Sequence, residues 1–115
     1  MNEQARSRHS LPESFVSEIV RRVVRRFKPE KIILFGSYAR GTPGPDSDVD
    51  LMIVMMYSGS KRENRIEIRK ALHGIGRAKD IVLVSPQEFD QLKDVVGTIV
   101  YPVSREGVTL YTKAA

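Results

Sequence analysis

Residues 36–51 read GSYARGTPGPDSDVDL and constrain the architecture more tightly than any other stretch of this chain. They follow a short apolar run, Lys31–Phe35, which predicts a buried strand. A Gly-Ser pair ends this strand and turns the chain into a short helix. Gly36 lets the backbone approach a ligand closely, and free N–H groups together with the Ser37 hydroxyl suit phosphate oxygens. The stretch therefore predicts a phosphate site at a strand–helix turn.

Two carboxylates follow in the next predicted strand. Residues 41–47 are rich in turn formers, and Asp48–Met55 has the pattern of a second strand. Asp48 and Asp50 are two positions apart, so both side chains leave the same face, with Cα atoms roughly 6–7 Å apart. Carboxylates this close repel each other unless a cation lies between them, and oxygen ligands without His or Cys select Mg²⁺, with Mn²⁺ as the alternative. The pair predicts a metal site that substrate phosphates would complete.

A third acid, Asp80, opens the apolar run 81–84, which predicts a third strand. An acid at this position can point from the sheet edge into the pocket of Asp48 and Asp50. It would then act either as general base on an acceptor hydroxyl or as part of a two-metal site. The sequence leaves both roles open.

Apolar spacing, together with start and stop signals, predicts the remaining elements. They are a helix from the capping box Ser10–Glu13 to Pro29, a helix over Ser60–Ile75, a helix from the capping box Ser85–Glu88 to about Val95, and a short helix ending at Gly107 with a brief extended piece after it. The order α-β-α-β-α-β-α-α is typical of a compact α/β domain. We predict a flexible N-terminus over residues 1–10 and a single domain over 11–115.

Composition narrows the class of protein. The chain has 115 residues, 41% hydrophobic and 29% charged, which fits a globular domain with one core. Zero cysteines exclude disulfides and thiolate metal sites and fit a reducing cytosol, so we expect a cytoplasmic protein. No apolar run approaches the roughly 18 residues of a membrane span, and the N-terminus lacks the apolar region of a signal peptide. The net charge of +5 favours polyanionic partners weakly and leaves direct nucleic-acid binding open.

The pattern of residues 36–51 resembles the signature of the DNA polymerase β-like nucleotidyltransferase superfamily. A Gly-Ser pair, ten further residues and an Asp-x-Asp pair match its core, and the motifs GSxARG (36–41) and SDxDL (47–51) resemble its minimal nucleotidyltransferase branch. Asp80 with its apolar run and the closing residues 106–111 extend the resemblance over most of the chain. The resemblance implies a small nucleotidyltransferase fold, in which a short mixed β-sheet is flanked by helices.

The resemblance also implies a reaction, the Mg²⁺-dependent attack of a hydroxyl on the α-phosphate of an NTP with release of pyrophosphate. The residues that it assigns are Gly36, Ser37 and Arg40 for the nucleotide, and Asp48, Asp50 and Asp80 for metal binding and catalysis. For Arg40, a phosphate contact and a structural ion pair both stay open.

The acceptor must come from elsewhere, because no second domain is left to hold it. The minimal branch resembles antitoxins that are paired with small HEPN-type ribonuclease toxins. This implies transfer of AMP from ATP onto a hydroxyl of such a toxin, with a tyrosine near its active site as the expected acceptor. Two other classes stay open: an antitoxin that neutralises its partner by binding alone, and nucleotidyl transfer to a small molecule such as an aminoglycoside or to an RNA 3′ end.

Other charged residues have ordinary explanations. Asp46 belongs to turn chemistry, and the four arginines within residues 21–26 are typical of a solvated helix face. His73 lies near a predicted helix end and His9 lies in the terminus that we expect to be frayed, so neither indicates a functional site.

Overall fold

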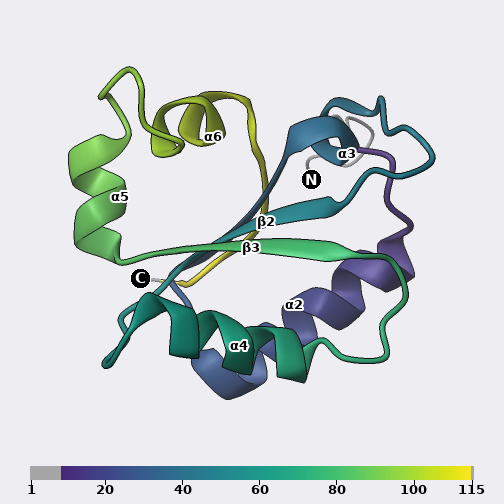
Figure 1. Cartoon of the computed structure of the whole chain (residues 1–115), viewed down its shortest axis with the longest axis horizontal. Helices are drawn as coiled ribbons and strands as arrows, with labels where there is room; N and C mark the ends of the chain where they lie inside the picture. Colours follow the sequence, from purple (N-terminus) through teal and green to yellow (C-terminus); the bar gives the residue numbers. More distant parts are fainter. Residues whose placement is uncertain (1–8, 115) are drawn as a thin grey trace.

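A computed structural model describes residues 9–114 and contains a four-stranded sheet with helices on both faces (Figure 1). The elements in chain order are α2 (Glu13–Phe27), β1 (Lys31–Phe35), α3 (Gly36–Arg40), β2 (Val49–Val54), α4 (Lys61–Ala71), β3 (Lys79–Val84), α5 (Pro86–Leu92), α6 (Val100–Glu106) and β4 (Val108–Thr112). None of these helices has the length and hydropathy to cross a membrane. Most of the predicted flexible N-terminus, residues 1–8, lies outside the described residues.

The sheet is mixed, with the strand order β3-β2-β1-β4. β1 pairs antiparallel with both β2 and β4, whereas β2 and β3 run parallel. A parallel pair needs a crossover connection, and α4 supplies it. The expected α/β fold with a short mixed sheet flanked by helices is therefore confirmed.

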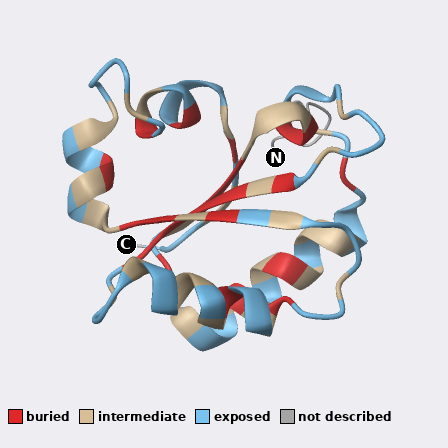
Figure 2. Cartoon of the chain, viewed as in Figure 1, coloured by how far each residue is buried: buried red, intermediate tan, exposed pale blue. Residues whose placement is uncertain are grey.

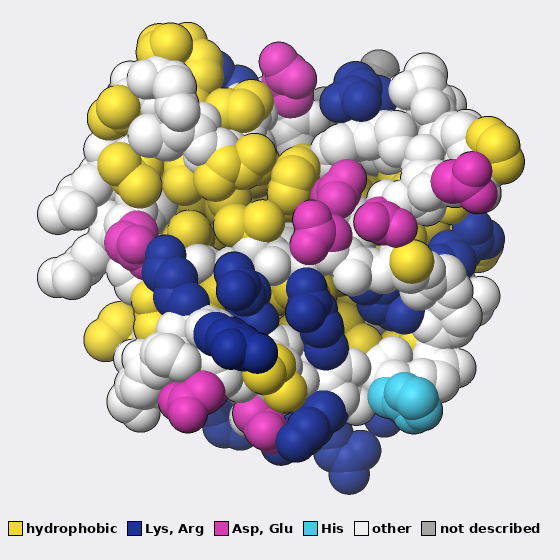
Figure 3. All heavy atoms as spheres, viewed as in Figure 1, with side chains coloured by type: hydrophobic (Ala, Val, Ile, Leu, Met, Phe, Trp, Pro, Cys, Tyr) yellow, Lys and Arg dark blue, Asp and Glu magenta, His cyan; other side chains and the backbone are white. Residues whose placement is uncertain are grey.

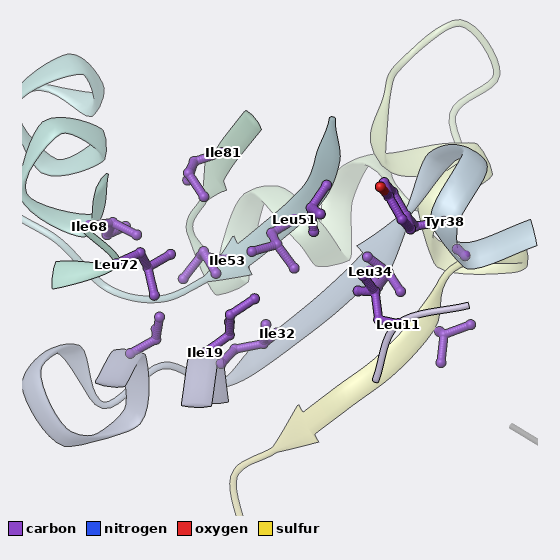
Figure 4. Packing of buried hydrophobic residues seen from close by; sticks show 14 of the residues in the cluster. Leu11, Ile19, Ile32, Leu34, Tyr38, Leu51, Ile53, Ile68, Leu72 and Ile81 are labelled. Carbon is purple, nitrogen blue, oxygen red and sulfur yellow. The ribbon is translucent and has the colours of Figure 1, made fainter. Parts of the chain in front are cut away.

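One face of the sheet packs against α2 and α4, where the larger core cluster lies (Figure 4). Ile32 and Leu34 from β1 contribute to this cluster together with Ile19 from α2 and Ile68 from α4, and all four are fully buried. Both helices bury one stripe and expose the opposite side to solvent, as the alternating colours in Figure 2 show. The amphipathic pattern of α2 is thus satisfied by the sheet.

The other face carries a smaller cluster under α5 and α6. Met52 and Val54 from β2 pack there with Phe89 from α5 and Val103 from α6. Because side chains alternate along a strand, the positions two and four residues before Met52 belong to this same face. This parity places Asp50 on the α5/α6 side of the sheet.

Several element boundaries differ from the prediction. Helix α2 starts at Glu13 with Pro12 as its N-cap and no side-chain cap, so the capping box at Ser10 was wrong, and the Ser10 N–H instead donates to the carbonyl of Tyr38. Helix α4 ends at Ala71 rather than Ile75, whereas the capping box at Ser85 is confirmed. The extended piece after Gly107 forms a fourth strand, β4, which pairs with β1. Its role depends on a partner far away in the chain, which local patterns do not reveal.

Candidate active site

The strand–turn–helix feature brings Gly36 against Asp50. Phe35, the last residue of β1, is the direct partner of Asp50 in β2, so the chain leaves the sheet at Gly36 beside that carboxylate. Gly36 has φ +76°, and a Cβ on it would overlap the Asp50 carboxylate. Two reasons therefore favour glycine at this position: the positive φ of the backbone, and the Asp50 carboxylate, which occupies the space of a side chain.

The acids of β2 and β3 meet across the parallel pair. Asp50 and Asp80 are direct register partners, so their side chains leave the same face, with backbones roughly 4.8 Å apart. Asp48 comes just before β2 and has the same parity as Asp50. Burial raises the pKa of Asp50 above its ordinary value, and the negative charges of Asp80 and Asp48 raise it further. The three predicted acids thus form one electrostatic unit at the end of the sheet.

Asp80 forms an ion pair with Arg69 of α4. The guanidinium Nη2 lies 3.8 Å from the Asp80 carboxylate, and both side chains are more than half exposed. The sequence reading missed Arg69, because its position depends on how α4 packs beside β3. Its only signal was the spacing that it shares with Arg62 and Arg65 along the helix.

The remaining predicted residues lie on α3. Ser37 is the second residue of this helix and is partly exposed, and its hydroxyl makes no hydrogen bond within residues 9–114. Arg40 is exposed and lies close enough to Asp50 for its positive charge to lower the pKa of that carboxyl. It lines a cavity of about 190 Å³ together with Gly36 and Glu106. Among the described residues Arg40 forms no ion pair, so its guanidinium is available to a ligand.

Comparison with protein families identifies the domain that carries these residues. The model of the nucleotidyltransferase domain matches residues 16–103, a range that includes the Gly36 turn and all three aspartates. The chain belongs to this family. A comparison with curated protein sequences finds no match.

A solved structure supports the fold of this nucleotidyltransferase. A crystal structure of a mutant of the MntA-HpeT toxin-antitoxin matches with a TM-score of 0.55 and 20% identity, over 90% of this chain and 75% of that chain. At this level of identity the likeness concerns the fold. The family match therefore supports the class of activity, and the strand pairings show where the aspartates lie.

The carboxylates of the nucleotidyltransferase fit a hard divalent cation. Nucleotidyltransferases generally use a nucleoside triphosphate together with a divalent metal ion. In such sites Mg²⁺ is bound by one or two carboxylates and by phosphate oxygens of the substrate. As the side chains stand, no three His, Cys, Asp or Glu residues within 9–114 are grouped to hold a metal ion. Asp48 and Asp50 could hold such an ion together with substrate oxygens, whereas the Asp80 carboxylate lies 3.8 Å from the Arg69 guanidinium.

Proposed function

We propose that this nucleotidyltransferase moves AMP from ATP onto a hydroxyl of a partner protein and thereby acts as the antitoxin of a HEPN-type ribonuclease toxin. The observation that carries the transfer is the register that sets Gly36 beside Asp50 and Asp50 beside Asp80. A phosphate-binding turn and three acids then share one end of the sheet. This is the arrangement that phosphoryl transfer requires, since positioning and charge neutralisation supply most of its catalysis.

The nucleotide would lie over the start of α3. Ser37 offers a free hydroxyl there, and Arg40 offers a cation that forms no ion pair with any described acid. Asp48 and Asp50 would hold Mg²⁺, which neutralises charge on the phosphates when bound. A small backbone at Gly36 keeps the triphosphate close to both aspartates.

The acceptor hydroxyl would approach from the side of β3. Asp80 lies there, exposed and at the sheet edge, in a position to take the proton as the hydroxyl oxygen attacks the α-phosphorus. The new phosphorus–oxygen bond forms while the bond to the leaving pyrophosphate breaks. Arg69 would keep the Asp80 carboxylate oriented until the acceptor arrives.

Two considerations support a toxin as the acceptor. The fold is similar to that of a protein from the MntA-HpeT toxin-antitoxin. Each transferred AMP adds a negative phosphodiester, and negative charge near a ribonuclease cleft repels RNA. Modification would therefore inactivate the toxin by electrostatics.

The test is transfer of labelled AMP to the product of the neighbouring gene, read by intact mass. We expect a gain of AMP units on that protein with Mg²⁺ and ATP, and its loss in the D48N variant. D46N is the matched control, because Asp46 is an exposed turn residue with the same charge. If a stable complex protects cells equally well with D48N, the protein neutralises its partner by binding alone. Transfer only to a small molecule or an RNA 3′ end would replace the proposed acceptor.

A further inference from the structure

Helix α4 presents a row of guanidinium groups beside the acidic site. Arg62, Arg65 and Arg69 are spaced at i, i+3 and i+7, so a helix of 3.6 residues per turn places all three within about 60° of one another. Figure 3 shows dark blue side chains lined up directly beside a group of acidic ones on one face of the molecule. We call these three residues the α4 arginine row.

The row is largely unneutralised. Arg62 and Arg65 form no ion pair or hydrogen bond within residues 9–114, and Arg69 reaches only the 3.8 Å contact with Asp80. The arginines of α2 differ, because three of the four have close partners. Arg21 and Arg22 share Glu18, at 2.5 and 2.8 Å, and Arg26 contacts Glu67 at 2.7 Å. Uncompensated cations therefore gather where α4 borders the active site.

The strand order fixes which side of the reaction the row faces. Gly36 follows β1, Asp50 lies in β2, Asp80 in the edge strand β3, and Arg69 on the helix beside β3. In the proposed function the triphosphate lies at α3, so the arginine row lies at the opposite side, where the acceptor would approach. A molecule that presents a hydroxyl to Asp80 would then lie close to this row, because Arg69 contacts the Asp80 carboxylate.

The chemistry of the row favours a protein over a nucleic acid. Ile66 lies beside the row and is 37% exposed, and α4 carries no aromatic side chain on which a base could stack. Arginine is enriched in protein interfaces, whereas lysine is depleted. Three arginines with an exposed isoleucine beside them fit a peptide surface that mixes carboxylates with apolar groups.

We propose that the α4 arginine row docks an acidic segment of the acceptor protein and so orients its hydroxyl toward Asp80. The proposal names the partner chemistry of the proposed transfer and rests on it. The acceptor has one preferred orientation, in which its acidic segment lies on the row and its neutral hydroxyl lies over the three aspartates. The reversed orientation would place the carboxylates of the acceptor against these aspartates. The arginine row acts through binding and orientation, and its residues take no part in the chemical step.

The test compares the R62E/R65E variant of the full chain with R25E/K113E. Arg25 and Lys113 are exposed cations outside the row, so both variants change the net charge equally. The probes are a short fluorescein-labelled peptide of glutamates around one tyrosine and a uridine oligonucleotide of the same length, followed by anisotropy at low ionic strength. Binding of Mg·ATP, measured by calorimetry, reports that the nucleotide site remains folded in each variant.

We expect R62E/R65E to weaken the acidic peptide roughly tenfold or more, with R25E/K113E close to wild type. Tighter binding of the oligonucleotide, lost in the same variant, would overturn the proposal in favour of RNA. Equal losses in both variants, or no binding of the peptide to the wild type, would overturn it as well. Peptide binding that depends on the row while AMP transfer is absent would refute the proposed function and leave the docking surface standing.

Discussion

Replacement of Gly36 by alanine separates backbone strain from the function of the site. The residue has φ +76°, and an L side chain in this region costs about 1–2 kcal/mol. The new Cβ would also overlap Asp50 Oδ2, which is the end of a flexible side chain, so the carboxylate can swing away at modest cost to folding. We therefore expect G36A to lose about 1–2 kcal/mol of stability. A displacement of Asp50 near 1 Å would lower the transfer rate about 100-fold.

The chain offers a matched control in Gly74. Its φ is +88°, and no heavy atom lies within 4 Å of a Cβ built there. G74A carries the same backbone strain without touching an acid, so urea unfolding should show losses of similar size in both variants. Each kcal/mol corresponds to about 4–8 °C in Tm for a domain of this size. Only G36A should lose nucleotide transfer and weaken the binding of Mg·ATP.

The reasoning fails if G36A transfers nucleotide at nearly the wild-type rate while it is destabilised like G74A. In that case the position of the Asp50 carboxylate would be unimportant for the reaction. It fails equally if G74A loses activity as G36A does, because strain alone would then explain the result.

Three further perturbations follow from contacts in the structure. Burial and two neighbouring acids raise the pKa of Asp50, so it holds its proton more tightly in the native state than in the unfolded chain. D50N should therefore raise Tm at neutral pH. This gain should shrink as pH falls toward 3.8, the ordinary pKa of an aspartate, where the carboxyl is protonated in both states. A D50N protein that is less stable than wild type at pH 7 would contradict this. Arg22 donates to two carbonyls at the end of α4, at 2.8 and 3.2 Å, so R22A should cost about 1–3 kcal/mol in urea unfolding. R21A removes only the surface ion pair with Glu18 and should cost less than about 1 kcal/mol. Equal losses in R22A and R21A would refute the claim that Arg22 fastens α2 to the end of α4. The Ser85 backbone N–H and Lys61 hold the pKa of Glu88 below its ordinary 4.5. E88Q should therefore lower stability above pH 4.5, and this loss should vanish as pH falls through the lowered pKa of Glu88. Thermal melts between pH 3 and 7 would detect the difference.

The local features of the site could be predicted from the sequence because they depend on neighbours in the chain. The strand ending at Phe35, the helix opened by Gly36 and the alternation of Asp48 and Asp50 all follow from spacing and from glycine chemistry. The capping box at Ser85 was equally readable, whereas the one at Ser10 was not real, since the Ser10 N–H bonds to Tyr38 from a distant part of the chain. Local sequence patterns predict an element correctly where contacts between neighbouring residues, rather than long-range ones, determine its structure.

The pairing of strands was decided only in three dimensions. No local pattern predicts the register of β2 against β3, and this register sets Asp50 directly beside Asp80. The same holds for Arg69, whose contact with Asp80 needs the packing of α4 along the sheet, and for β4, which becomes a strand because β1 has a free edge. The sequence by itself determined which chemical groups the protein has and the local geometry of each. The tertiary structure decided which groups meet, because hydrogen-bond register and burial bring together residues that are far apart along the chain.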